Sequence, residues 1–170
     1  ASIDKQTKAI FFASPNNPTG NIASDKQIRT LLDTGVIVVV DETYYEFCGK
    51  SSLNLLTEYE NLIILRTFSK WAGLAGLRIG LGVMSQSLAG TMMSMKPPYN
   101  VNLAAEVALT ASLDDRETLM TRVHAIVQER GRLISKLEGI PNVKPYPSEA
   151  NFILTQLPTG RGKGIFEGLC

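Results

Sequence analysis

The chain has 170 residues, of which 44% are hydrophobic and 19% are charged, and its formal net charge is +1. These values predict a globular protein and exclude the basic stripe that nucleic-acid binding requires. No apolar run approaches the roughly 18 residues of a membrane-spanning helix, so we expect no membrane partner. Two cysteines, Cys48 and Cys170, are too few for a disulfide framework. Together with the absence of a signal-peptide pattern, they predict a soluble intracellular protein, with cytoplasm and plastid stroma both open.

Strands and helices alternate in the first half of the chain. The segment PNNPTG predicts a turn after the first strand. Residues 24–35 predict a helix that is capped by Ser24 and terminated by Gly35. Unbroken aliphatic runs are typical of parallel strands that are buried on both faces. The predicted strands are residues 8–14, 36–42, 61–67 and 77–84.

The second half of the chain is mostly helical from residue 86 onward, with an interruption at KPPYNVN. A long helix over residues 116–137 carries an amphipathic apolar stripe. The stripe consists of Leu119, Val123, Ile126, Val127, Leu133, Ile134 and Leu137. Residues 142–157 predict two strands around a proline-rich bend. A second, small α+β unit is therefore expected to begin near residue 113.

Polar side chains follow three of the predicted strands. Asn17 comes after the first strand, Asp41 ends the second, and Lys70 follows the third. Because parallel strands present their carboxyl ends at one edge of a sheet, these three groups should meet there. Too few residues separate Lys70 from the fourth strand for a parallel crossover, so that strand should run antiparallel. Its first residues, including Arg78, then start at the same edge.

This set of side chains matches the chemical groups of pyridoxal phosphate. An amine beside a cation in apolar surroundings is suited to forming a Schiff base with an aldehyde. Asp41 can hold a proton on a ring nitrogen, and the amide of Asn17 is aimed by the proline that follows it. A phosphate can be bound by a guanidinium and two hydroxyls, those of Arg78, Thr67 and Ser69. The sequence therefore predicts pyridoxal 5'-phosphate as the cofactor.

Three segments, SPNNPTG, DETYYEF and TFSKWAGLAGLRIG, resemble the pyridoxal-site signatures of fold-type I aminotransferases. The segments RTFSK, AGLAGLRIG, PPYNVN and SEANFIL are most similar to the histidinol-phosphate branch of that family. The resemblance implies an α/β three-layer sandwich with a mostly parallel sheet. Residues 1–112 would form part of the large domain and residues 113–170 part of a small α+β domain. The implied reaction converts histidinol phosphate and 2-oxoglutarate into imidazole acetol phosphate and glutamate, in histidine biosynthesis.

The resemblance also assigns roles by position. It implies that Lys70 carries the cofactor and moves a proton between substrate and cofactor, and that Asp41 pairs with the pyridine nitrogen. Tyr44 and Asn17 would donate hydrogen bonds to the phenolic oxygen of the ring. The implied phosphate ligands are Arg78, Ser69 and Thr67. Asn151 is a candidate substrate contact, although a plain role at the start of a strand is also open, and no metal is implied.

Members of the family are considerably longer than this chain, so we expect a fragment of a homodimeric enzyme that is inactive by itself. The implied missing parts include a glycine-rich turn, an aromatic residue that stacks on the ring and an arginine for the substrate carboxylate. Other functions stay open. They are an amino-acid-phosphate decarboxylase, another aromatic aminotransferase, a non-catalytic pyridoxal-phosphate carrier and an interaction module with an inert lysine.

Several further residues are of types that often have catalytic or binding roles, but their positions in the sequence do not favour such roles. Glu42 and Glu46 resemble catalytic carboxylates, but alternation along the strand points Glu42 away from Asp41. We interpret both glutamates as solvated or structural. Trp71 is expected to pack against apolar neighbours, and His124 has no second ligand spaced for a metal.

Overall fold

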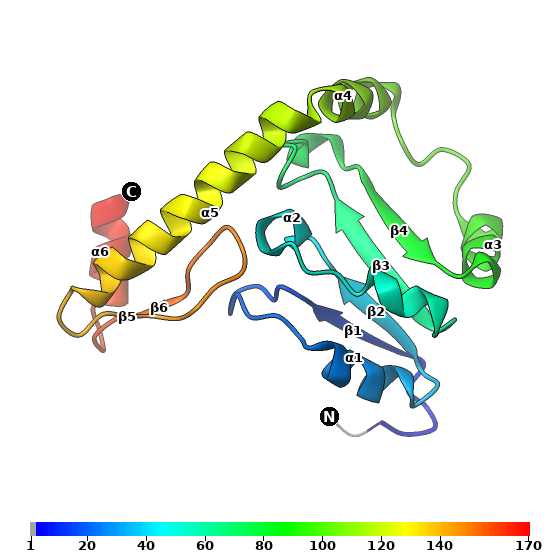
Figure 1. The fold of residues 1–170 in the computed structure, drawn as a ribbon, viewed down its shortest axis with the longest axis horizontal. Coiled ribbons are helices and arrows are strands. Elements are labelled where there is room, and N and C mark those ends of the chain that lie inside the picture. The colour runs from blue at the N-terminus through cyan, green and yellow to red at the C-terminus, as the bar shows by residue number, and fades with distance from the viewer. Residues whose placement is uncertain (1–2) are drawn as a thin grey trace.

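The computed structural model describes residues 3–170 (Figure 1). Its elements in chain order are β1 (Ala9–Ala13), α1 (Asp25–Leu32), β2 (Ile37–Asp41), α2 (Tyr45–Cys48), η1 (Leu53–Thr57), β3 (Leu62–Thr67), η2 (Ala75–Leu77), β4 (Gly80–Met84), α3 (Gln86–Met95), α4 (Leu103–Asp114), α5 (Arg116–Glu138), β5 (Lys144–Pro145), β6 (Thr155–Gln156) and α6 (Gly162–Leu169). The elements η1 and η2 are short 3-10 helices.

The four strands of the first half form one sheet in the order β1-β2-β3-β4. The first three strands are parallel, and β4 runs antiparallel to β3. The predicted mostly parallel sheet and its antiparallel fourth strand are therefore confirmed. β4 begins only at Gly80 rather than near residue 77. The difference arises because η2 and Arg78, which has a left-handed φ of 55°, interrupt the extended backbone just before it.

Helix α1 begins at the predicted cap. The Ser24 side chain accepts a hydrogen bond from the Gln27 N–H, and the Gln27 side chain accepts one from the Ser24 N–H. This reciprocal pair satisfies two backbone donors at the start of the helix. The helix ends at Leu32 rather than at Gly35, which adopts a positive φ in the turn that follows.

The main hydrophobic core lies on the face of the sheet that α1 and η1 cover (Figure 1). Its buried members are Ile28, Leu32, Val38, Val40, Leu55, Leu62 and Ile64. Strand β2 is buried on both faces, as its sequence predicts, because Val39 on the opposite face is also buried. In β1, by contrast, Phe11 on that opposite face is 72% exposed.

The predicted long helix is confirmed as α5. Its apolar stripe is only partly buried: Val123 is enclosed, whereas Ile126 and Leu133 are exposed. Val123 packs with Tyr44, Phe47 and Ala150 in a second cluster that joins α5 to α2. The strands predicted within residues 142–157 shorten to a two-residue pair, β5 and β6. Prolines in this segment have no N–H to donate to a longer ladder.

A loop between β5 and β6 packs against the turn that follows β1. The Glu149 N–H donates to the Gly20 carbonyl over 2.8 Å. Gly20 has a φ of +75°, and a Cβ atom there would lie 2.5 Å from Ser148 Oγ and 2.9 Å from Ser148 Cα. Arg130 of α5 fixes the other side of the loop by donating to the Ala150 carbonyl over 2.7 Å. The C-terminal part of the chain is thereby attached to the edge of the main sheet.

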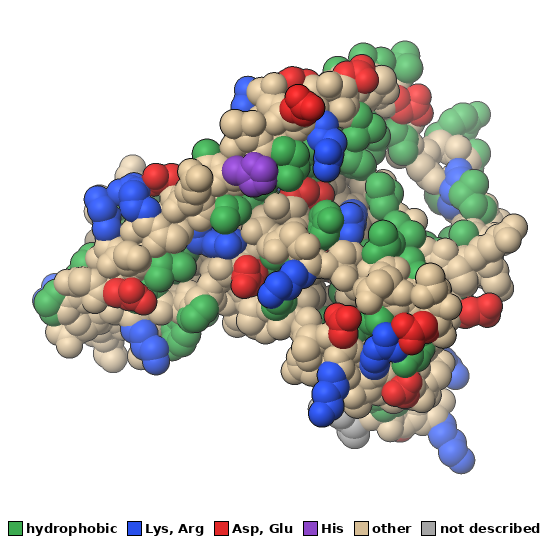
Figure 2. Space-filling model, in the orientation of Figure 1, with side chains coloured by type: hydrophobic (Ala, Val, Ile, Leu, Met, Phe, Trp, Pro, Cys, Tyr) green, Lys and Arg blue, Asp and Glu red, His purple; other side chains and the backbone are tan. Residues whose placement is uncertain are grey.

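Charged side chains of both signs are interspersed over the surface seen in Figure 2, in keeping with the small net charge. Hydrophobic side chains gather around α3 and α4 in the same view. The exposed apolar residues of this stretch include Met92, Met93, Met95, Leu103 and Val107. Within residues 3–170, no helix has the length and apolar character to cross a membrane.

Replacing Gly20 by alanine is expected to destabilise the protein more than replacing Gly35. Both glycines have positive φ, +75° and +76°, but a Cβ at Gly35 meets nothing within 4 Å. Gly35→Ala should therefore cost only the backbone strain of the left-handed conformation, about 1 to 2 kcal/mol. Gly20→Ala should cost about 1 to 3 kcal/mol more, because Ser148 must move. Urea unfolding of both variants measures the difference, and equal losses would contradict the close packing of this loop.

Candidate functional site

The carboxyl ends of β1, β2 and β3 lie at one edge of the sheet, and the turn after β1 is joined to β2 there. The Ser14 N–H donates to the Asp41 carbonyl over 2.9 Å. The turn is closed by a hydrogen bond of 2.7 Å from the Gly20 N–H to the Asn16 carbonyl. The Asn17 side-chain amide points from this turn to Tyr44, and its Nδ2 atom donates to Tyr44 Oη over 3.1 Å.

Tyr44 lies at the centre of the site. Its side chain is 6% exposed, and its ring meets the ring of Phe152 edge-on, with centroids 5.1 Å apart. The ammonium nitrogen of Lys70 lies 5.9 Å from the centre of the Tyr44 ring. The structure thus places Asn17 and Lys70 on either side of Tyr44, at the edge of the sheet where the sequence predicts that Asn17 and Lys70 meet. Lys70 itself is exposed rather than enclosed by apolar groups, because it lies in the loop beyond β3.

Asp41 ends β2 at the same edge, in register with Ala13 of β1 and Leu65 of β3. Its Oδ1 atom accepts hydrogen bonds from the Thr43 N–H over 2.9 Å and from the Thr43 hydroxyl over 2.5 Å. Thr43 therefore sets the orientation of this carboxylate. This role of Thr43 was not predicted from the sequence.

Thr67 and Ser69 lie on the backbone segment that is paired with the start of β4, and Arg78 comes two residues before that strand. The Thr67 hydroxyl donates to Ser69 Oγ over 2.9 Å, and the Ser69 N–H donates to Thr67 Oγ1 over 3.1 Å. The Phe68 N–H donates to the carbonyl of Ile79, the neighbour of Arg78, over 3.3 Å. The Arg78 guanidinium is exposed and donates to the Ala75 carbonyl over 2.9 Å. Two hydroxyls and a guanidinium therefore stand on adjoining backbone segments.

Among residues 3–170, no hydrogen bond links the Asn151 side chain to Asn17, Tyr44 or Lys70. Its side chain is exposed and lines a groove of about 360 Å³ along α5. The groove is lined by Ala125, Ile126, Glu129, Arg130, Arg132, Leu133, Asn151, Phe152 and Ile153. Asn151 is connected to the sheet edge through its neighbour Phe152, which packs on Tyr44.

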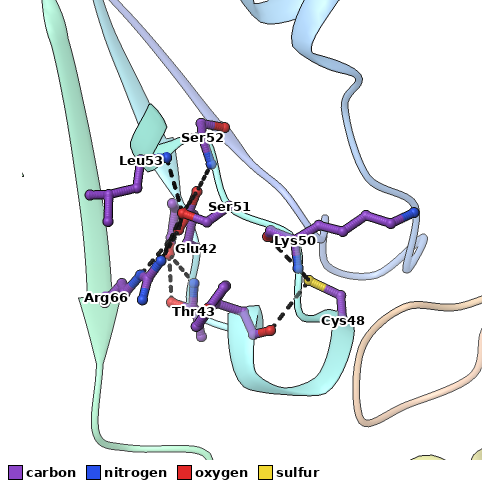
Figure 3. Close-up of polar contacts among 10 residues, drawn as sticks. Glu42, Thr43, Cys48, Lys50, Ser51, Ser52, Leu53 and Arg66 are labelled. Carbon is purple, nitrogen blue, oxygen red and sulfur yellow. Dashed lines mark hydrogen bonds and ion pairs between the residues drawn. The ribbon is translucent and has the colours of Figure 1, made fainter. Parts of the chain in front are cut away.

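A buried polar cluster that was not predicted from the sequence lies directly beside this edge (Figure 3). Glu42 is 1% exposed and forms a salt bridge of 2.9 Å with Arg66. The expectation that Glu42 is structural agrees with this position, whereas solvation of Glu42 is excluded by its burial. Side-chain alternation along β2 and β3 assigns Glu42 and Arg66 to the face opposite Asp41, so it could have indicated the pair. Only the register of the two strands shows that Glu42 and Arg66 lie next to each other. Trp71 packs on Phe68, with ring centroids 5.8 Å apart.

Glu46 is the second glutamate of this region, and burial raises its pKa to about 7. Among the described residues, its Oε2 atom is buried without a hydrogen-bond partner. The side chain lines a cavity of about 280 Å³ next to α2. The other lining residues are Tyr45, Gly49, Arg66, Trp71, Arg116 and Met120. The positive charges of Arg66 and Arg116 oppose the rise without cancelling it. Glu46 is thus partly buried rather than solvated.

The sequence model of the family described as aminotransferase class I and II matches residues 1–163 of this chain. The chain belongs to that family. The histidinol-phosphate aminotransferase of Dehalococcoides mccartyi strain CBDB1 is 49% identical over 164 residues, which are 96% of this chain and 46% of that protein. The match confirms the predicted resemblance to the histidinol-phosphate branch.

Solved structures of aminotransferases share the fold. The histidinol-phosphate aminotransferase of Clostridium acetobutylicum superimposes with a TM-score of 0.85 at 26% identity, over 95% of this chain and 51% of that chain. The Sinorhizobium meliloti enzyme, solved in complex with pyridoxal-5'-phosphate, gives a TM-score of 0.77 at 25% identity, over 86% and 41%. The chain thus spans about half the length of the aminotransferases that it matches.

The raised pKa of Glu46 predicts a pH dependence of stability in this aminotransferase chain. Between its ordinary value of 4.5 and about 7, the folded chain holds a proton that the unfolded chain has released. The free energy of unfolding should therefore fall as the pH rises through this window. Glu46→Gln cannot ionise, so its stability relative to wild type should be about 1 to 2 kcal/mol greater at pH 8 than at pH 4. The exposed Glu106→Gln serves as the control, and parallel pH profiles for wild type and Glu46→Gln would contradict the assignment.

Proposed function

We propose that the protein containing this chain is a pyridoxal-phosphate-dependent histidinol-phosphate transaminase. It would transfer the amino group of histidinol phosphate to 2-oxoglutarate, which yields imidazole acetol phosphate and glutamate. The observation that carries the proposal is the position of the Lys70 amine beside the Asn17–Tyr44 hydrogen bond, at the edge where β2 ends in Asp41. Relatives with this name support the choice of substrate.

The donor set fits the chemistry of pyridoxal phosphate. The cofactor has an aldehyde, a ring nitrogen, a phenolic oxygen and a phosphate. An amine suits the aldehyde, a carboxylate suits the ring nitrogen, and the hydrogen-bonding pair of Asn17 and Tyr44 suits the phenolic oxygen. The hydroxyls and guanidinium on the adjoining segments suit the phosphate. The proposed phosphate ligands are Thr67, Ser69 and Arg78.

Each residue then has a separate task. Pyridoxal phosphate, when bound, supplies an electron sink that stabilises negative charge at the substrate carbon. Asp41, oriented by Thr43, would keep a proton on the ring nitrogen. Asn17 and Tyr44 would donate hydrogen bonds to the phenolic oxygen. The Lys70 amine would hold the aldehyde carbon and, once displaced by substrate, would move a proton between the substrate carbon and the cofactor carbon.

The second part of the chain is proposed to act on the substrate side. Residues 113–170 would form part of a small domain that follows the cofactor-binding residues 1–112. Asn151 is proposed as a substrate contact, since its neighbour Phe152 already packs on Tyr44. We propose a homodimer for the whole protein, in which the exposed apolar side chains around α3 and α4 are covered.

The lysine assignment is tested by chemical labelling. Borohydride reduction of the full-length holoenzyme, followed by proteolysis and mass spectrometry, should attach a pyridoxyl group to Lys70. A label on Lys96 or Lys163 instead would show that the amine was misassigned. Transfer of an amino group from glutamate to the bound cofactor separates a transaminase from a decarboxylase or a non-catalytic carrier.

Asp41→Asn should abolish most turnover while the cofactor stays bound. The carboxylate favours the protonated ring, which matters most as negative charge develops on the substrate carbon. Groups of this kind are worth about 2 to 4 kcal/mol of the barrier, or roughly thirty- to a thousandfold in rate. Single-turnover transamination with glutamate measures the loss, with the exposed Asp114→Asn as the matched control. A near wild-type rate in Asp41→Asn would limit Asp41 to capping the Thr43 turn.

A further inference from the structure

Glu42 is a buried carboxylate whose oxygens are fully engaged (Figure 3). Its Oε2 atom accepts from Arg66 Nη2 over 2.9 Å, from Arg66 Nε over 3.1 Å and from Ser51 Oγ over 2.8 Å. Its Oε1 atom accepts from the Ser52 N–H over 2.6 Å. The charge is therefore compensated by one guanidinium and further hydrogen bonds, which fix the carboxylate in one orientation.

Arg66 is held equally firmly. Its guanidinium lies over the ring of Tyr45, 3.6 Å from the ring centre, and its Nη2 atom also donates to Ser51 Oγ over 2.7 Å. Only 21% of its side-chain surface is exposed. The planar guanidinium is thus stacked on one face and hydrogen-bonded along its edge, an arrangement that a lysine ammonium cannot reproduce.

Stability alone does not account for such a pair. Replacing a buried ion pair with apolar residues of similar size is often neutral or stabilising, because the desolvation of two charges offsets much of their attraction. What the pair does provide is directional geometry.

The pair joins β2 and β3 where the two strands separate. Glu42 directly follows Asp41, and its N–H donates to the Leu65 carbonyl over 2.8 Å. Arg66 is next to Thr67, the last residue of β3. Beyond this point the chain leads from β2 to Tyr44, and from β3 through Ser69 to Lys70. The salt bridge spans the two strands on the face opposite Asp41, at the last position where they lie side by side.

We propose that Glu42 and Arg66 are positioning residues, which hold Asp41 and the Lys70 loop at the spacing that pyridoxal phosphate requires. This inference rests on the proposed function. A displacement of about 1 Å at reacting groups can lower rates by up to about a hundredfold. Loss of the pair should therefore affect cofactor binding and turnover while leaving the stability of the fold almost unchanged.

The test uses the full-length protein with the double variant Glu42→Leu/Arg66→Met, which removes both charges and keeps apolar volume. Its melting temperature is expected to stay within about 4 °C of wild type. Its dissociation constant for pyridoxal phosphate should rise, and its single-turnover rate at saturating cofactor should fall, each by about ten- to a hundredfold. The matched control is Arg29→Met/Glu58→Leu, which removes the exposed Arg29–Glu58 pair and should leave both quantities at wild-type values.

Cofactor affinity and rate within twofold of wild type in the double variant would overturn the inference. If that variant melts far below wild type, Arg66→Lys decides the question, since it keeps the positive charge and loses the paired N–H donors. Arg66→Lys should melt like wild type and bind the cofactor about tenfold more weakly, and wild-type affinity would overturn the inference. A wild-type protein that binds no pyridoxal phosphate would overturn both this inference and the proposed function. If Lys70 carries the pyridoxyl label but the Glu42 and Arg66 variants keep wild-type cofactor affinity and rate, only the positioning role is overturned.

Discussion

The parallel pairing of β1, β2 and β3 is the constraint on which the candidate site depends. Because all three strands run in one direction, their carboxyl ends meet at one edge, and each strand is followed there by a polar segment. The register places Ala13, Asp41 and Leu65 side by side. A shift of one residue would exchange the faces of Asp41 and Glu42, so that Asp41 rather than Glu42 would lie on the face that carries the main core. The apolar packing of α1 and η1 on the sheet therefore also decides which of the two acidic residues is buried.

Adjacent residues of one strand end consequently have different environments. Glu42 is enclosed with Arg66 and two serines on the face of the sheet that carries the main core. Asp41 stands on the other face, with one oxygen engaged by Thr43. The first arrangement compensates a buried charge completely, whereas the second orients a carboxylate at an accessible edge. Two acidic residues with the same functional group thus differ in burial and in their hydrogen-bond partners at neighbouring positions.

The C-terminal part of the chain contributes to the same edge by packing. The loop between β5 and β6 meets the turn after β1 at Gly20 and Ser148, and Phe152 packs against Tyr44. Arg130 ties that loop to α5. The position of Tyr44, which accepts the hydrogen bond from Asn17, therefore depends on contacts with residues more than a hundred positions further along the chain.

Local sequence was sufficient for the alternation of strands and helices, the Ser24 cap, the antiparallel fourth strand and the meeting of Asn17 and Lys70 at one edge. These features depend on short-range preferences and on the limited ways in which parallel strands can be connected. Tertiary structure decided the rest. Three features depend on which residues distant in sequence become neighbours across strands or loops. They are the Glu42–Arg66 pair, the contact of Phe152 with Tyr44 and the exposure of Lys70. Side-chain alternation specifies the face of a residue but not its partner, because the partner is set by register and packing over the whole chain.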